Sequence, residues 1–263
     1  MKKVIMVIVA GSLLAACGEP GKKEAGIPKN SDWNADNLKG MVKTLEIMTY
    51  TPDSTGAIDK PDSCCSDVQH YDEQGYFTSF ESKTTAGIVS TSGTATRYPD
   101  GRMKEFINMK HGKQQGRFSI ELDEKGQYAH AIGYDSNNVM DIYYTDITDN
   151  DFGAITGAVA HHPDSSIKES FKSVYQGPIM ESSTTTDSLG KTKSTFMITL
   201  NDKLDREKTI YTNHGKDSTT TEVETFTYET YDDQGNWTQR TTYDKDGKPK
   251  KVVKRTITYY PKA

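Results

Sequence analysis

The sequence predicts a mainly β protein, an open antiparallel meander sheet of hairpins joined by Asp/Gly turns, with at most one short helix. Strand-forming aromatic residues are plentiful: 15 tyrosines, 8 phenylalanines and 2 tryptophans. Apolar and polar residues alternate through several short segments, as they do in strands with one buried face. Between those segments an aspartate is repeatedly followed three residues later by a glycine, which is typical of hairpin turns.

Residues 1–16 have the layout of an export signal, with Lys2 and Lys3 before the apolar run at 4–14 and small residues after it. That run is shorter than the roughly 20 residues that a membrane-spanning helix needs, so we expect it to be removed. The motif Leu14-Ala15-Ala16-Cys17 resembles the lipobox of bacterial lipoproteins. The resemblance implies cleavage before Cys17 and lipidation of its sulfur, which gives stable membrane attachment once two or more acyl chains are present.

Residues 17–37 are expected to form the lipidated cysteine and a flexible tether, because glycines and prolines interrupt any apolar periodicity there. A short helix can start within residues 31–37, but Gly40 weakens its continuation. Residues 41–50 fit a helix or a strand, and we favour a strand. The expected organisation is a signal peptide at 1–16, the tether at 17–37 and an antiparallel β domain at 38–263.

The turn pattern Tyr-Asp-x-x-Gly occurs at residues 71–75, 231–235 and 243–247. Residues 122–126 keep the aspartate and the glycine, and residues 134–138 place Asn138 in the glycine position. Aspartate at the first position can accept backbone N–H bonds, and glycine supplies the positive φ that closes a type I turn with a G1 bulge. Asparagine is the best substitute at such a position. Each of these segments is therefore predicted to be a hairpin turn.

The segments beside these turns have strand-like alternation, for example residues 118–122 and 128–134. Near the C-terminus, Trp237, Thr241 and Tyr243 are expected on one face of a strand. The alternation breaks between residues 149 and 177. Within that stretch, residues 166–176 fit either a capped short helix or a strand with Phe171 inward.

The turn motifs resemble those of the YD-repeat, or RHS-type, class of secreted bacterial β proteins, particularly short lipoproteins of the Bacteroidetes. The likeness is strongest in residues 231–260, which read as two such units, and it covers about half of the mature chain in separated pieces. Residues 100–106 also look like the short hairpin repeats of MORN-like proteins. Large YD-repeat proteins wrap a sheet into a shell around another polypeptide, but few and irregularly spaced units here argue against encapsulation. The resemblance implies an open antiparallel sheet.

Charge and cysteine content narrow the classes of partner. The chain has 32 basic and 37 acidic residues, and loss of Lys2 and Lys3 with the signal changes its net charge from −5 to −7. An acidic balance argues against nucleic acid as the main partner. Apart from Cys17, the cysteines are the adjacent Cys64 and Cys65, whose spacing matches no standard metal framework, and we expect a structural or incidental pair.

A search for catalytic or metal-binding motifs leaves no convincing site. His161-His162-Pro163-Asp164 has ligand types that zinc or copper uses, but adjacent strand residues point to opposite faces, so we expect a solvated loop. The turn acids, such as Asp123, Asp146, Asp149 and Asp151, do not spell a calcium loop. A Gly-x-Ser-x-Gly elbow is absent from the sequence. We therefore expect no catalytic residue, no metal and no cofactor.

These patterns predict a lipid-anchored protein of the cell envelope that is not an enzyme and acts as a binding or assembly module of unidentified ligand. Gly18 after the cysteine is compatible with the outer membrane, with the protein facing either the periplasm or the cell exterior. The alternative is a surface lipoprotein that binds or hydrolyses glycans. An open sheet edge would favour an envelope protein partner through strand addition, and an aromatic groove with two carboxylates would favour the glycan alternative.

Overall fold

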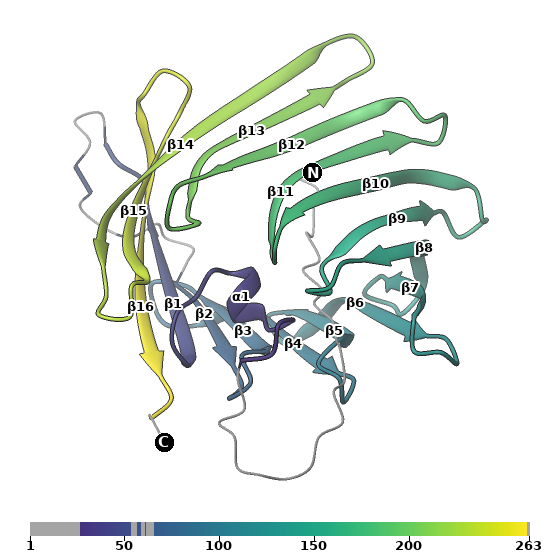
Figure 1. The fold of residues 1–263 in the computed structure, drawn as a ribbon, viewed down its shortest axis with the longest axis horizontal. Coiled ribbons are helices and arrows are strands. Elements are labelled where there is room, and N and C mark those ends of the chain that lie inside the picture. The colour runs from purple at the N-terminus through teal and green to yellow at the C-terminus, as the bar shows by residue number, and fades with distance from the viewer. Residues whose placement is uncertain (1–26, 54–56, 59–60, 62–65, 262–263) are drawn as a thin grey trace.

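The computed structural model describes residues 27–53, 57–58, 61 and 66–261. Sixteen antiparallel strands form a closed barrel, and a short helix, α1 (Asp32–Ala35), lies inside the ring of strands (Figure 1). The strands are β1 (Val42–Tyr50), β2 (Ser66–Tyr71), β3 (Phe77–Lys83), β4 (Val89–Arg97), β5 (Met103–Lys110), β6 (Lys113–Leu122), β7 (Tyr128–Tyr134), β8 (Met140–Asp149), β9 (Ile155–His161), β10 (Ile167–Gln176), β11 (Ile179–Asp187), β12 (Thr192–Leu200), β13 (Arg206–His214), β14 (Thr219–Tyr231), β15 (Trp237–Tyr243) and β16 (Pro249–Tyr259).

The prediction of an open meander sheet is wrong, although the mainly β composition and the meander connectivity are confirmed. Strand β1 pairs with β2 on one side and with β16 on the other, with Leu45 opposite both Gln69 and Ile257. The first and last strands therefore satisfy each other's backbone groups, and the barrel has no free edge. The expectation that a partner binds by adding a strand to an open edge is therefore withdrawn.

The hairpin turns form as the sequence predicts. Gly75, Gly126, Gly235 and Gly247 have φ between 74° and 88°, and Asn138 has φ 60°. In the turn at residues 72–76, the Asp72 Oδ1 accepts N–H bonds from Gln74 and Tyr76, both at 2.9 Å. The same two bonds recur where Asp123, Asp135, Asp232 and Asp244 open their turns. Aspartate at the first turn position is therefore the shared device that reverses the chain.

Two ambiguous segments are strands. Residues 41–50 contain β1, as favoured, and residues 166–176 contain β10, so the capped helix is excluded there. The expected grouping of Trp237 with Thr241 and Tyr243 is wrong. A register shift at the start of β15 places the Trp237 ring against the guanidinium groups of Arg240 and Arg255 instead.

The N-terminal residues differ most from expectation. The assigned tether covered residues 17–37, and the part that the structure describes, residues 27–37, is folded against the barrel. Ser31 caps α1, its side chain accepting the Asn34 N–H at 3.4 Å, and Trp33 is completely buried. The signal peptide, Cys17, Cys64 and Cys65 lie outside the described residues.

Candidate functional site

The inner face of the barrel can be traced from the helix outward, because directly paired residues of neighbouring strands lie on the same face. Leu45 of β1 belongs to the same buried cluster as Trp33 of α1 and therefore points inward. The pairing runs from Leu45 through Gln69 to Phe80 and Gly93. The interior of this wall is thus continuous from β1 to β4.

Aromatic side chains extend this inner face across the next strands. The Phe80 and Phe106 rings are stacked with centroids 6.2 Å apart, Phe106 pairs with Phe118, and the Phe118 and Tyr144 rings meet edge to face at 5.9 Å. Phe106 and Phe118 form a second buried cluster with Met103, Ile120 and Ala131, and the partly buried Phe80 and Tyr144 pack against it. Aromatic and aliphatic side chains therefore make up much of the lumen wall on this side.

The outer face carries charge at mid-strand. Because side chains alternate along a strand, the neighbours of inward residues point outward. Glu105 and Arg117, next to Phe106 and Phe118, form an ion pair at 2.9 Å across β5 and β6. Other outward charges at mid-strand are Glu46, Lys172 and Lys254, and outward charges nearer the strand ends are Glu81, Glu121, Asp141 and Lys208.

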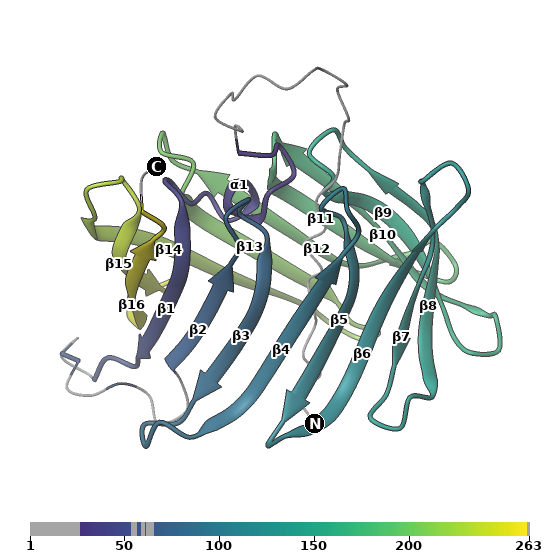
Figure 2. The same ribbon diagram turned by 90° about the horizontal axis from the view of Figure 1, so that it is seen from below.

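Residues 28–41, which we call the N-terminal plug, lie at one end of the barrel, and α1 is their central part (Figure 2). Trp33 packs in a buried cluster with Leu38, Val42, Leu45 and Tyr71. Gly75 makes room for the indole, since a Cβ atom at that position would lie 2.5 Å from the Trp33 ring. The plug is therefore part of the hydrophobic core.

Four turns at this end of the barrel bind the plug by hydrogen bonds. The turn at 72–76 accepts the Trp33 N–H at Gly75 O (3.2 Å), and the turn at 98–102 accepts the Asn30 Nδ2 at Asp100 O (3.2 Å). Across the ring, Asn37 Nδ2 donates to Asp205 (3.0 Å) and the Lys39 N–H donates to Asn236 Oδ1 (2.7 Å). The plug thus ties opposite walls together.

Two carboxyl groups of the plug, the buried Asp32 and the more exposed Asp36, face the barrel. Asp32 accepts the Phe77 N–H at 2.6 Å and pairs with Arg97 at 2.5 Å. Burial raises the pKa of Asp32 to about 7, although the Arg97 charge opposes the shift. Asp36 Oδ2 accepts a hydrogen bond from the Tyr71 hydroxyl at 3.0 Å, and desolvation of that carboxyl raises its pKa as well.

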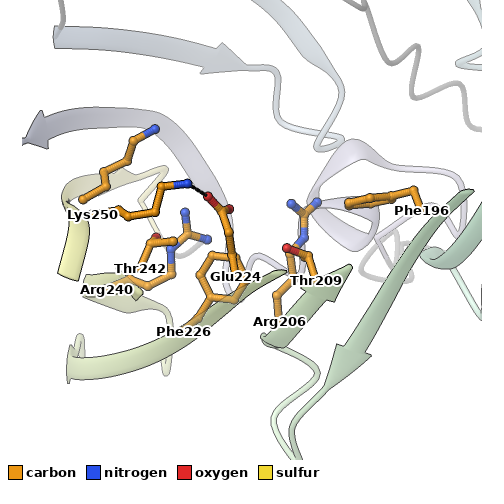
Figure 3. Close-up of a pocket in the computed structure, with 9 residues that line it drawn as sticks. Phe196, Arg206, Thr209, Glu224, Phe226, Arg240, Thr242 and Lys250 are labelled. Carbon is orange, nitrogen blue, oxygen red and sulfur yellow. Dashed lines mark hydrogen bonds and ion pairs between the residues drawn. The ribbon is translucent and has the colours of Figure 1, made fainter. Parts of the chain in front are cut away.

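Beyond the plug, a cavity of about 440 Å³ opens on the inner face of β12 to β16 (Figure 3). Phe196 and Arg206 stand opposite Glu224, Phe226 and Arg240. The other lining residues are Thr209, Thr242, Lys250 and Lys251. Glu224 is the one acid among these described lining residues, and it pairs with Lys250 at 2.7 Å. The cavity has the volume of a small-molecule site and an excess of positive charge.

The guanidinium groups at the plug side of this cavity are poorly solvated. The Arg255 and Arg240 side chains lie over the Trp237 ring at 3.4 and 4.8 Å from its centroid. The Nε atoms of both arginines are buried and have no hydrogen-bond partner among the described residues. Burial lowers the pKa of Arg255 to about 10, with the Arg240 charge adding to the shift, and burial also lowers the pKa of Arg240.

The residues that the sequence singled out lie apart from this cavity. His161 is at the end of β9, stacked on Tyr143 with ring centroids 4.6 Å apart and bonded to the Thr145 hydroxyl at 2.9 Å. Asp123 accepts backbone N–H bonds within its hairpin turn. Within the described ranges, no three His, Cys, Asp or Glu side chains come close enough together to hold a metal. None of the helices that the structure describes has the length and apolar character needed to cross a membrane.

Sequence reasoning missed the cationic cavity. A signal was present in β16, where Arg255 lies two residues from both Val253 and Ile257 and so shares their face. Arg240 pairs directly with Val253, which places it on that face too. A cation on the apolar face of a strand is the pattern that would have indicated a charged lumen.

Comparisons with known proteins identify the fold but no family. No protein-family model matches the chain, and no curated protein matches it. The crystal structure of a porin-like protein from Bacteroides uniformis is similar over 82% of this chain and 96% of that chain, with a TM-score of 0.52 and 12% identity. This likeness supports the barrel fold alone.

Two further structures match more weakly. A porin-like protein from Bacteroides vulgatus matches 85% of this chain and 100% of that chain, with a TM-score of 0.36 and 11% identity. The Tc holotoxin pore of Photorhabdus luminescens matches 82% of this chain and 11% of that chain, with a TM-score of 0.31 and 12% identity. The lipoprotein and YD-repeat assignments rest on the sequence motifs.

Proposed function

We propose that the protein is a non-enzymatic binding protein of the bacterial cell envelope, held to the outer membrane by a lipid on Cys17, and that it binds its ligand inside the barrel. The observation that supports this most strongly is the distribution of polarity between the two faces. The inner face carries aromatic residues and cations together with acids such as Glu224 and Glu169, and the outer face carries charges on several strands. The barrel therefore suits a compartment that stands in water.

A barrel that spans a membrane differs at its outer face, where it presents an apolar band about 25 Å tall to the lipid. Arginine or lysine on the lipid face costs about 2–4 kcal/mol at the bilayer midplane. Arg117, Lys172 and Lys254 lie outward at mid-strand and would meet that cost together. The proposal is consequently a tethered barrel rather than a pore.

Binding is favoured over hydrolysis by the chemistry of the cavity. Glycosidases generally use two carboxyl groups about 5 to 10 Å apart, one as acid and one as base or nucleophile. Glu224 is the single acid of the described lining, and Lys250 already pairs with it. The glycan alternative is retained only as a binding function, with the aromatic wall as its stacking surface.

Acyl labelling with membrane fractionation tests the anchor. The wild type should incorporate the labelled acyl chain and sediment with membranes, and Cys17→Ser should do neither and should remain folded in buffer without detergent. A double variant, Cys64→Ser with Cys65→Ser, is the matched control and should behave as wild type. Retention of unlabelled Cys17→Ser in carbonate-washed membranes would show that the barrel itself holds the bilayer, contrary to the proposal.

A further inference from the structure

We infer that the lumen cavity binds a small organic anion, one that carries a carboxylate or phosphate on an apolar body. This inference rests on the proposed binding function and specifies its ligand class. It follows from three features of the described residues, namely an excess of cations over acids, guanidinium groups that are shielded from water, and aromatic walls beside them.

The lining has more cations than its acid can neutralise. Glu224 is engaged by Lys250, which leaves Arg206, Arg240 and Lys251 without a carboxylate at ion-pair distance among the described residues. Arg255 adds a further charge behind Arg240, and the Asp36 carboxyl of the plug offsets part of it. Like charges held together in a partly dry space repel each other, so an anion that enters gains from all of them at once.

Burial makes this gain larger. The Nε atoms of Arg240 and Arg255 have lost water and have no protein acceptor among the described residues. These two donors are buried beneath the cavity wall, and their burial keeps water from screening the two guanidinium charges. A carboxylate or phosphate can accept from a guanidinium through two parallel bonds, which is the geometry that arginine offers and lysine does not.

The walls indicate what the anion is attached to. Phe196 and Phe226 flank the charged groups, and the Trp237 ring lies behind Arg240 and Arg255. Arg240 already lies over the Phe226 ring, 4.9 Å from its centroid, and a bare inorganic anion would add no apolar contact to either phenyl ring. An apolar or aromatic body of the ligand would cover them, and a volume of about 440 Å³ accommodates a small molecule rather than a polymer.

Two dyes that differ only in charge test the inference on the full-length protein. 8-Anilinonaphthalene-1-sulfonate is an aromatic anion, and N-phenyl-1-naphthylamine is the same ring system without the sulfonate. We expect the anion to bind at least tenfold more tightly, and its affinity to fall as salt is raised. Displacement by 1-naphthoate and by 1-naphthyl phosphate then separates carboxylate from phosphate preference, with 1-naphthol as the neutral control.

Single substitutions show where on the protein the anionic dye binds. Arg240→Gln should weaken the anionic dye about tenfold to a hundredfold and leave the neutral dye unchanged. Arg117→Gln, an arginine of the outer face, is the matched control and should change neither. Because Arg240 packs on Trp237, the solvent-exposed Lys251→Gln provides a second variant whose folding is not at risk.

The outcomes separate this inference from the proposed function. Equal binding of both dyes, unaffected by Arg240→Gln and Lys251→Gln, overturns the anion preference but leaves a binding lumen. Failure of both dyes and of all naphthyl competitors to bind contradicts the lumen as a binding compartment and so the proposed function as well. Tighter binding of the anion that Arg117→Gln weakens as much as Arg240→Gln places the site on the outer face and also overturns the inference.

Discussion

Removal of the Trp33 side chain should loosen the plug and destabilise the whole barrel. Trp33 is completely buried, and its loss in Trp33→Ala leaves a cavity between Leu45, Tyr71 and Gly75. A buried aromatic side chain covers about 150–250 Å², which at about 25 cal/mol per Å² corresponds to about 4–6 kcal/mol. The indole Nε1–H has no hydrogen-bond partner among the described residues, so removing this unsatisfied donor offsets about 1–3 kcal/mol of the lost stability.

The net expectation for Trp33→Ala is therefore a loss of about 3 kcal/mol in the free energy of unfolding. Urea denaturation followed by the fluorescence of Trp237 measures it, with a midpoint lower by about 1 M at a slope of about 3 kcal/mol per M. Hydrogen exchange of residues 31–41 should accelerate more than that of β5 to β8, because the plug opens first.

Leu189→Ala is the control, since Leu189 is 91% exposed at the turn between β11 and β12, and it should change stability by less than about 0.5 kcal/mol. An unchanged urea midpoint for Trp33→Ala, together with unchanged exchange of residues 31–41, would refute the reasoning. The plug would then not be a structural part of the barrel.

Three further predictions concern the turns, the plug carboxyl and the closure. Gly235→Ala should lower the free energy of unfolding by about 1–2 kcal/mol, from backbone strain alone. Gly75→Ala should lower it by about 1–3 kcal/mol more, because the added Cβ meets the Trp33 ring. Equal losses of the two variants in thermal unfolding would contradict that contact. Burial raises the pKa of Asp32 from 3.8 to about 7, so the folded protein holds this proton more tightly than the unfolded chain does. The contribution of Asp32 to the free energy of unfolding should therefore be greatest below about pH 4 and be lost as pH rises through about 7. Asp32→Asn should flatten that profile in urea titrations, and an unchanged slope would exclude Asp32 as its source. Thr44→Cys with Thr258→Cys, directly paired across β1 and β16, should form a disulfide in the folded protein, and failure under oxidising conditions would contradict barrel closure.

Local features of the fold could be predicted from the sequence because their causes are local. Asp72 and Gly75 illustrate this: one supplies the acceptor and the other the positive φ of the turn, and both lie within five residues. The turn at 201–205 does not match the sequence pattern, because Leu204, a residue type that rarely adopts positive φ, occupies the glycine position with φ 64°.

Barrel closure and the candidate site depend on contacts between residues far apart in the chain. The sequences of β1 and β16 alone do not predict that Thr44 pairs with Thr258, because that pairing depends on the number and stagger of all the intervening strands. The tether prediction failed over residues 27–37 for a similar reason. Most apolar partners of Trp33, such as Leu45 and Tyr71, lie farther along the chain, where local sequence reasoning does not connect them to it.

The most direct test of the proposed function asks what surrounds the outer face of the barrel. In a Cys64→Ser, Cys65→Ser background, a single cysteine replaces Glu105 or Lys172, which point outward at mid-strand, and carries an environment-sensitive fluorophore. The lipidated protein is then placed in vesicles whose acyl chains carry nitroxide quenchers, with a label at Gly21→Cys, close to the anchor, as the positive control. We predict water-like emission and little quenching at both barrel positions. Strong quenching at Glu105→Cys and Lys172→Cys would place those strands in the hydrocarbon and contradict the account of a tethered barrel that binds its ligand inside.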